Sequence, residues 1–511
     1  MAFKPPNGIH MSLLNRLPKL KDFTGERLLR MAVIIIGAFS AITYLWVVLN
    51  RISYPFDLEW IEGGMTEIVR RILNGQSIYT APGVNFTPFL YPPLYFYLSA
   101  LVAKITGFSF FPLRLVSLAA SCISGAAIFA IVRREAQEEF PAFIAASLFF
   151  GMFHVTGAWM DLARVDSLFL AFLLLAFYFA RATQPSSAAF AGIFAALAVL
   201  TKQTALIICL PLAIYLFLTD WKRGLLFSGT AALITGGVTL WFNIQSGGWY
   251  VYYVFTLLNQ QTDWIISDIW VFWNRDLIAP LGIALLVSLF FLGNLFFDDC
   301  RSFFFWASLL AGCLVGSILT RVKVGGAENV LFPLYSMLAI LFGLGIHNLL
   351  TLKPKALYKN LLYIAILFQF IILSYNPLTQ IPSQADINAG NNLVQYISRI
   401  NGEVYIPNHT YLSTLANKQP FAHYSAVWDV LRGEAQSDGK DALTNGLSSA
   451  ICHQEFSAII VDDDWYALPG LETYYTYTGS IPYEGDAFFP LTGRHSRPIN
   501  IYTPNKSVTC P

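Results

Sequence analysis

The sequence predicts a polytopic α-helical membrane protein of about eleven transmembrane helices, with a small α/β domain at its C-terminal end. Of its 511 residues, 56% are hydrophobic and 12% are charged, against about 25% charged in a typical soluble domain. The hydrophobic residues form runs of membrane-spanning length separated by short charged loops, until the composition becomes polar after Tyr375. A net charge of +1 gives no indication of nucleic-acid binding.

The first hydrophobic run, 31–50, follows a basic N-terminal tail, 1–30. This run is too long for the hydrophobic region of a signal peptide, so we expect it to be retained as the first span, with the tail in the cytoplasm. Ten further runs are predicted to span the membrane: 112–132, 140–160, 166–181, 187–201, 203–219, 224–242, 277–297, 302–320, 328–350 and 360–376. The predicted membrane domain is therefore 31–376.

One apolar segment, Tyr91–Gly107, has two interpretations. If it spans the membrane, every later loop changes sides, and the basic pairs Arg133-Arg134 and Lys222-Arg223 lie outside. If it lies in the membrane interface, both pairs face the cytoplasm, as the positive-inside rule requires. We therefore expect an interfacial helix here and eleven spans in total.

Two long loops then face outward, 51–111 and 243–276. The first contains a predicted amphipathic helix whose apolar and polar faces are Ile61, Met65, Ile68, Val69 and Ile72 against Glu67, Arg70 and Arg71. Such a helix is expected to lie on the membrane surface. The second loop is rich in Trp and Tyr, and we expect it to cover the functional site.

The polar region 377–511 is predicted to be a small α/β domain. Its strand-like stretches are Glu403–Pro407, Ala458–Asp462 and Pro498–Tyr502, and a helix is expected around Asn391–Ile400. The parity of the spans places this domain outside the cell. Cys452 and Cys510 are the only two of the six cysteines in it, and an oxidising compartment would favour a disulfide between them.

Two acidic segments lie in the predicted outer loops, Asp57-Leu58-Glu59-Trp60-Ile61-Glu62 and Asp161-Leu162-Ala163-Arg164-Val165-Asp166. Carboxylates beside a bilayer core are costly to bury, so their presence on one side of the membrane indicates chemistry there. The sequence has no C-x-x-C or His-rich spacing typical of a metal cage. The sequence therefore assigns no cofactor with certainty, and a divalent metal is left open.

Five motifs follow one another within 31–376. They are the acidic first-loop motif, Pro92-Pro93-Leu94, Arg114-Leu115-Val116-Ser117, Asp166 in the second outer loop, and Leu200-Thr201-Lys202-Gln203 between two short spans. In this order they resemble the GT-C fold glycosyltransferases, in particular the protein O-mannosyltransferases and the lipid A aminoarabinose transferase. The resemblance implies inverting transfer of a sugar from a polyprenyl-phosphate-linked donor. The acceptor would be a glycan, lipid or protein at the extracytoplasmic face of the plasma membrane.

The resemblance also assigns roles to residues. Asp57 matches the family's first-loop Asp and is the candidate base for the acceptor hydroxyl, with Glu59 as a second candidate. Asp166 matches the second-loop acid and would position the acceptor or a cation. The departing lipid phosphate needs cations, for which the candidates are Arg164, Lys202, Arg321 and Lys323. Tyr91 stands before the two prolines, where the family often has His or Lys, and is a further candidate for donor binding.

Most of these candidates also have a purely structural interpretation. Asp57 could cap the helix that follows, and Asp161 and Arg164 could form an i,i+3 ion pair. Lys202 could simply extend its amine to the membrane surface, and Tyr91 could be an interfacial anchor.

The rival function is a transporter or flippase of a lipid-linked saccharide. Coupled transporters usually carry ionisable groups within their spans. Several of the predicted spans contain no Asp, Glu, Lys or Arg, and this favours the enzyme.

Overall fold

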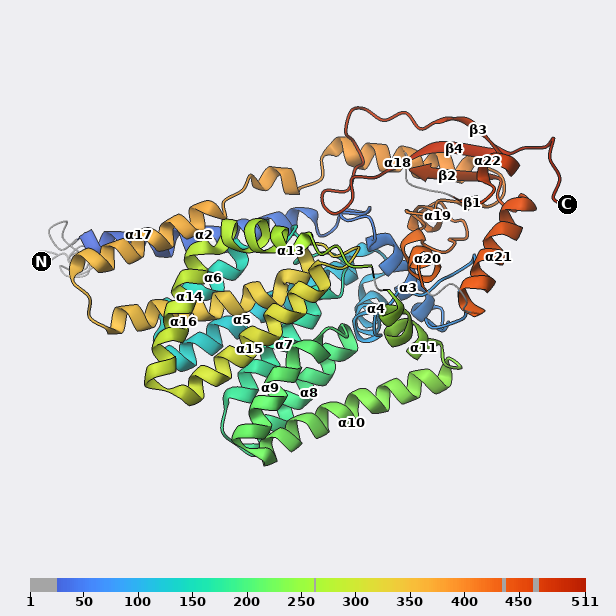
Figure 1. Cartoon of the computed structure of the whole chain (residues 1–511). Helices are drawn as coiled ribbons and strands as arrows, with labels where there is room; N and C mark the ends of the chain where they lie inside the picture. Colours follow the sequence, from blue (N-terminus) through green and yellow to red (C-terminus); the bar gives the residue numbers. More distant parts are fainter. Residues whose placement is uncertain (1–24, 262, 434–437, 463–467) are drawn as a thin grey trace, which may run out of the picture.

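A helical bundle and a smaller C-terminal domain make up the molecule. The computed structural model describes residues 25–261, 263–433, 438–462 and 468–511. Residues 1–24 of the predicted cytoplasmic tail lie outside the described ranges. The N-terminal end of helix α2 and the C-terminus lie at opposite ends of the molecule (Figure 1).

Each predicted span overlaps a helix of the bundle. The helices are α2 (Gly25–Arg51), α5 (Phe110–Ala136), α6 (Glu139–Gly151), α7 (Asp166–Arg181), α8 (Pro185–Thr201), α9 (Ala205–Thr219), α10 (Trp221–Gln245), α14 (Ala279–Asp298), α15 (Cys300–Arg321), α16 (Phe332–Thr351) and α17 (Ala356–Ile372). Caps fix several boundaries: Ser109 accepts a hydrogen bond from the amide of Phe111 at the start of α5, and Asp220 caps α10.

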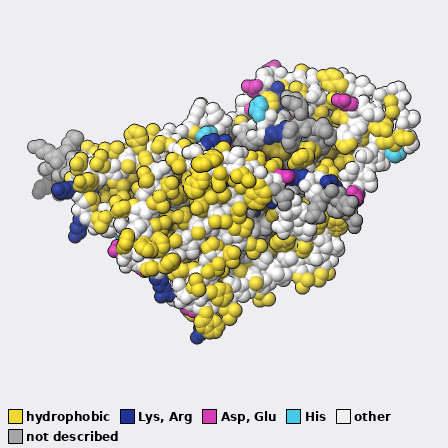
Figure 2. All heavy atoms as spheres, viewed as in Figure 1, with side chains coloured by type: hydrophobic (Ala, Val, Ile, Leu, Met, Phe, Trp, Pro, Cys, Tyr) yellow, Lys and Arg dark blue, Asp and Glu magenta, His cyan; other side chains and the backbone are white. Residues whose placement is uncertain are grey.

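Length and composition identify the bundle as the membrane part. In the described part of the chain, six helices are long and apolar enough to cross a membrane, or seven if the bent pair Ala356–Ile372 and Pro377–Arg399 counts as one span. Shorter apolar helices accompany them: α4 (Leu94–Thr106), α6, α8 and α9. Hydrophobic side chains cover the visible face of the bundle (Figure 2). The chain is thus a multi-pass membrane protein, and the figure of eleven spans stays a prediction.

The predicted span 140–160 is helical only in its first half. Helix α6 ends at Gly151, and the chain then turns through Gly157 and Ala158, both with positive φ. These left-handed residues cannot continue a right-handed helix. The rest of the hydrophobic run therefore folds as turns that carry Trp159 and the second acidic segment inward.

The amphipathic helix of the first loop forms as predicted, as α3 (Glu62–Leu73). Its expected place on the membrane surface is wrong, because Met65, Ile68 and Val69 of its apolar face are buried within the protein. Glu67 is buried and accepts a hydrogen bond of 2.6 Å from Thr414 of the C-terminal domain. Helix α3 lies between the bundle and that domain. The segment Tyr91–Gly107, predicted to be interfacial, forms the short helix α4 and then joins α5.

The second long loop, 243–276, is mostly helical. It contains α11 (Trp249–Val251), the π-helix η2 (Tyr252–Thr256), α12 (Leu257–Gln260), α13 (Asp268–Val271) and the start of the π-helix η3 (Phe272–Ile278). After α15, the 3₁₀ helix η4 (Glu328–Leu331) leads into α16.

The C-terminal domain is built on a four-stranded sheet of order β1-β2-β4-β3. The strands are β1 (Val404–Tyr405), β2 (Ala458–Asp462), β3 (Tyr475–Ser480) and β4 (Pro498–Pro504), with β1 parallel to β2 and the other pairs antiparallel. The accompanying helices are η5 (Pro377–Gln380), α18 (Gln384–Arg399), α19 (Tyr411–Leu415), α20 (Tyr424–Leu431), α21 (Asp438–Cys452) and α22 (Leu471–Tyr474). The three predicted strands and the predicted helix are present, and β3 was not foreseen.

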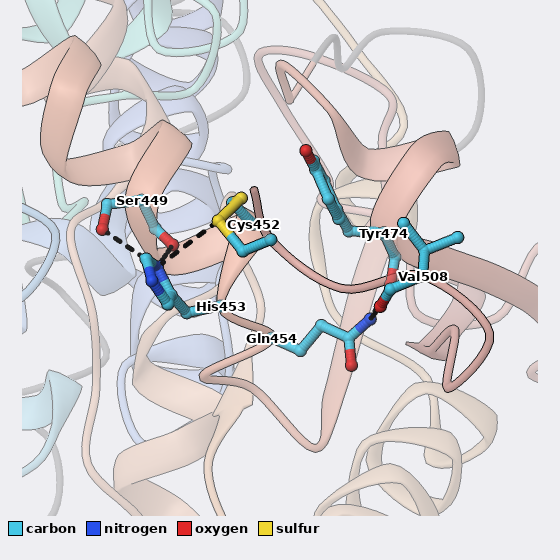
Figure 3. Close-up of a disulfide and its surroundings, with 7 residues drawn as sticks. Ser449, Cys452, His453, Gln454, Tyr474 and Val508 are labelled. Carbon is cyan, nitrogen blue, oxygen red and sulfur yellow. Dashed lines mark hydrogen bonds between the residues drawn. A yellow bond between two sulfur atoms is a disulfide. The ribbon is translucent and has the colours of Figure 1, made fainter.

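The predicted disulfide joins Cys452 at the end of α21 to Cys510, with Cα atoms 5.1 Å apart. Beside it, the side chain of Gln454 donates to the carbonyl oxygens of Tyr474 and Val508 (Figure 3). The disulfide and these hydrogen bonds hold the segment after β4 against α21 and α22.

Candidate active site

The first acidic motif folds into a compact loop that its own carboxylates close. The amide of Leu58 donates to Oε2 of Glu62 at 2.7 Å, and the amide of Gly63 donates to Oδ1 of Asp57 at 2.7 Å. Asp57 thus satisfies one of the free amides in the first turn of α3, as the capping interpretation expected. Glu59, Trp60 and Ile61 form the tip of this closed loop.

On the bundle side, buried ion pairs anchor the loop. Arg114 donates from Nη2 to Oε2 of Glu62 at 2.7 Å, and both side chains are fully buried. Glu62 also accepts from the amide of Ala163, which joins the first outer loop to the second. Burial alone would raise the pKa of Glu62, but the charge and the hydrogen bonds of the Arg114 guanidinium lower it below its ordinary value.

The second outer loop, which carries the acidic segment Asp161–Asp166, is anchored in the same way. Asp161 pairs with Arg51 at the end of α2, with Nε to Oδ2 at 2.8 Å. The proposed i,i+3 pair between Asp161 and Arg164 therefore does not form. Arg164 points instead to Glu59, with Nη1 to Oε2 at 2.8 Å, and donates from Nη2 to the hydroxyl of Tyr91 at 3.0 Å.

Glu59 is the least satisfied of the buried carboxylates in the loop. Its Oε2 accepts from Arg164 and from the amide of Ile61, but its Oε1 is buried with no hydrogen-bond partner. Burial raises the pKa of Glu59 to about 7, against the opposing effect of the Arg164 guanidinium. A carboxyl group with this pKa can accept a proton near neutral pH.

The C-terminal domain covers Glu59 closely. The amide of Thr492 donates to the carbonyl of Leu58 at 3.2 Å, and Thr492 forms an isolated parallel β-bridge with Glu59. The next residue, Gly493, has φ +77°, and a Cβ placed there would lie 3.0 Å from Cγ of Glu59 and 3.2 Å from Oε1. Glycine permits both the left-handed backbone and this close approach.

A cavity of about 970 Å³ adjoins Glu59 and brings together most of the predicted site residues. Those lining it are Glu59, Tyr91, Arg164, Lys202 and Lys323. Its apolar wall includes Leu206, Ile207 and Leu319 from the ends of α9 and α15, and the loop 243–276 contributes Val254, Phe255 and Leu258. That loop therefore forms part of the site wall, as expected. Asp57, Asp166 and Arg321 do not line the cavity.

Two of the predicted residues outside the lining hold charged groups near it. Asp166 accepts from Lys202 at 2.6 Å and from Asn329 at 3.0 Å, so the lysine amine is held at the cavity and not at a membrane surface. Arg321 donates to the buried carboxylate of Asp276 at 2.8 Å. Lys323 donates from Nζ to the carbonyl of Leu258 at 2.9 Å, and burial lowers its pKa.

Several residues of the site could not be found from the sequence motifs. Trp428, Asp429 and Arg432 of α20 and its end line the cavity, and Gln203 donates across it to the carbonyls of Leu90 and Val254. Only Gln203 lay in a motif that we singled out. The residues of α20 lie in the C-terminal domain, where no sequence signal pointed to the cavity.

The described ranges contain no obvious set of side chains to hold a metal ion. In these residues no three His, Cys, Asp or Glu side chains are grouped as a metal ion would require. The question of a divalent metal stays where the sequence left it.

Comparison with known proteins identifies the architecture. A family model described as dolichyl-phosphate-mannose-protein mannosyltransferase matches residues 91–249. Crystal structures of ArnT from Cupriavidus metallidurans, bound to undecaprenyl phosphate and in the apo state, superpose with TM-scores of 0.58 and 0.59 at 12% and 11% identity, covering 94% of this chain and 99% of ArnT.

Other similarities are weaker. The oligosaccharyltransferase of Archaeoglobus fulgidus gives a TM-score of 0.48 at 12% identity, over 84% of this chain and 68% of that one, which is too low to support an argument. Among curated proteins, no sequence matches significantly. From the ArnT superposition over almost the whole of both chains, the protein has the GT-C glycosyltransferase fold.

Proposed function

We propose that the protein transfers a sugar from a polyprenyl-phosphate-linked donor to a hydroxyl acceptor at the extracytoplasmic face of the plasma membrane, with inversion. One observation carries the proposal: a carboxylate with a partnerless oxygen, Glu59, shares a cavity with the cations Arg164, Lys202 and Lys323. The fold supports it, because ArnT has been crystallised with undecaprenyl phosphate.

In the proposed reaction, the acceptor oxygen attacks the anomeric carbon as the bond from that carbon to the phosphate oxygen breaks. Glu59 takes the proton of the acceptor hydroxyl on Oε1. The lipid phosphate leaves with the bonding electrons, and its negative charge is stabilised by Arg164, Lys202 and Lys323, with Tyr91 as an additional hydroxyl donor. Attack opposite the leaving phosphate inverts the anomeric centre.

The geometry favours Glu59 over Asp57 as the base. Both carboxylate oxygens of Asp57 are engaged, Oδ1 by the amide of Gly63 and Oδ2 by His409. Asp57 also does not line the cavity. We therefore assign Asp57 to positioning, together with Asp166, which orients Lys202, and Arg321, which donates to the carbonyl of Gly326 in the cavity lining.

The apolar wall suits the lipid part of the donor. Leu206, Ile207 and Leu319 lie at the ends of membrane helices, so a prenyl chain can continue from the cavity into the bilayer. The outer location is supported by the basic pairs Arg133-Arg134 and Lys222-Arg223, which lie at the opposite ends of α5 and α10 from the cavity.

The test compares cells producing the wild-type protein with cells producing Glu59→Gln. We expect the variant to accumulate a polyprenyl-phosphate-linked sugar, identified by mass spectrometry of the lipid extract. Membranes given that lipid should release polyprenyl phosphate about a hundredfold more slowly than wild type. The control is Glu472→Gln, at an exposed position of α22.

Three outcomes would contradict the proposal or its assignment of the base. Normal release by Glu59→Gln together with loss of release in Asp57→Asn would return the base role to Asp57. If no lipid-linked sugar accumulates in any inactive variant, the protein is not a lipid-linked glycosyltransferase. Accumulation of the lipid-linked sugar on the cytoplasmic face of the membrane, with no release of polyprenyl phosphate by the wild-type protein, would instead support a flippase.

A further inference from the structure

A row of three buried charged groups lies outside the cavity and takes no part in the proposed chemistry. Nδ1 of His409 lies 3.0 Å from Oδ2 of Asp57, and its Nε2 lies 3.5 Å from Oδ2 of Asp462. All three side chains are at most 3% exposed. Asp57 belongs to the first outer loop, whereas His409 follows β1 and Asp462 ends β2.

We infer that His409 is a positioning residue for Glu59, because its imidazolium ties the loop that carries Glu59 to the C-terminal domain. The inference rests on the proposed function, in which Glu59 is the base. His409 itself touches neither the cavity nor Glu59.

Charge explains why a histidine stands at this position. Burial alone would lower the pKa of His409, but the carboxylates of Asp462 and Asp57 raise it to about 10. The ring is therefore a cation between two anions. Without it, two carboxylates would face each other in a buried site, which is strongly unfavourable. Of the neighbouring groups, Glu62 and Tyr411 also lie close to Asp57, and His423 lies close to His409.

The row reaches Glu59 along the first outer loop. Oδ1 of Asp57 accepts the amide of Gly63 at 2.7 Å, which closes the loop 57–63 with Glu59 at its tip. With Oδ2 fixed by His409, the carboxylate that closes the loop cannot rotate away. The bundle side of the same loop is fixed separately by Glu62 and Arg114.

The row also reaches Glu59 from the other side, through the C-terminal domain. Asp462 accepts hydrogen bonds from Asn408 and from the hydroxyl of Ser496. Ser496 stands two residues after the segment Thr492–Arg494, whose Gly493 lies against Glu59. The same segment is fixed to the second outer loop, where the indole of Trp159 donates to Thr492 at 3.2 Å. His409 thus connects the loop 57–63, which carries Glu59, to the segment Thr492–Arg494, which packs against Glu59.

A role in folding alone would also explain a buried ion pair, so the test needs two readouts. The first is hydrogen exchange, followed by mass spectrometry, of the peptide containing residues 57–64 in the full-length protein in nanodiscs. The second is the split between kcat and KM for the lipid-linked donor identified in the Glu59→Gln cells. The variants are His409→Asn and the milder Asp462→Asn, and the control is His453→Asn, on the exposed end of α21.

We expect exchange in the 57–64 peptide to be at least about tenfold faster in His409→Asn, with a smaller change in Asp462→Asn and none in His453→Asn. Because the donor cations lie on other segments, kcat should fall by about tenfold while the donor KM stays within about twofold. If His409→Asn does not fold, Asp462→Asn decides the question by the same readouts.

Unchanged exchange in a folded variant would overturn the inference, since His409 would then not fix the loop. Faster exchange with unchanged kcat would overturn it too, because the loop would be fixed without consequence for transfer. If the wild-type protein releases no polyprenyl phosphate, the proposed function fails and with it the link to transfer. The exchange result still decides separately whether His409 anchors the loop.

Discussion

Two glutamates three positions apart in one loop occupy very different surroundings. Glu62 lies on the bundle side, where Arg114 and the amides of Leu58 and Ala163 satisfy both carboxylate oxygens. Glu59 lies at the cavity, where Arg164 reaches only one oxygen and the other has no partner. The pKa of Glu62 is lowered, whereas that of Glu59 is raised to about 7.

The difference separates a structural carboxylate from the proposed base. Both groups are fully buried, so burial alone does not distinguish them. What distinguishes them is the number of hydrogen-bond donors: a satisfied buried ion stabilises the fold, whereas an unsatisfied one needs another explanation. This contrast leads to three expectations, from the largest effect to the smallest.

The bundle-side pair should matter most for stability. Arg114→Met leaves Glu62 buried without its cation, and breaking a buried pair in this way typically costs about 3–5 kcal/mol. We expect a clear loss of thermal stability in detergent solution, with poor membrane yield. Arg133→Met, at an exposed position, is the matched control. Equal stability of the two variants would show that the Glu62 site is not structural.

The cavity-side group should govern the pH dependence of transfer. Glu59 accepts a proton only when it is ionised, and its pKa of about 7 lies above the ordinary value for glutamate. Below pH 7 the rate should therefore fall about tenfold per pH unit, equivalent to about 1.4 kcal/mol, and it should level off above pH 7. Initial rates of polyprenyl phosphate release between pH 5 and 9 measure this. A rate that stays flat down to about pH 5 would point to a base with an ordinary pKa.

The smallest expected effect is that of Glu59→Gln on stability. The amide resembles the protonated carboxyl group that is already half populated near neutral pH. Arg164 loses a charged partner but keeps its hydrogen bond to Tyr91 and the nearby carboxylate of Asp166. We expect the unfolding free energy to change by no more than about 1 kcal/mol, within the range of most single substitutions. Thermal unfolding of the same detergent-solubilised preparation provides the measurement. A loss as large as that of Arg114→Met would remove the distinction between the two sites.

The sequence was informative where the signal was local. Hydrophobic runs predicted every helix of the bundle, since a span must satisfy its backbone within one segment. The short apolar run of Ala458–Asp462 predicted β2 with its observed bounds. The cysteines at 452 and 510 were paired correctly because only those two fell in the polar domain. The end of α6 at Gly151 was missed, because the hydrophobic run continues past it into turns.

Long-range contacts were beyond the sequence. Asp161 was adjacent enough to Arg164 to suggest a pair, yet its partner is Arg51, 110 residues earlier. Asp57 matched a family motif, but it contacts a histidine 352 residues away and does not line the cavity, whereas Glu59 does. The nature of a buried charge depends on which groups the fold brings to it, and spacing along the chain does not encode this.

The covering of Glu59 by Thr492–Arg494 has a consequence for biosynthesis. Membrane helices are inserted in order as the chain is made, so the first outer loop and the cavity cations are in place long before the segment that covers them is synthesised. During that interval the loop has its bundle-side anchor and lacks the one that depends on His409, 352 residues later. On the proposed function, the nascent protein therefore becomes competent for transfer only when the C-terminal sheet has folded onto the first outer loop.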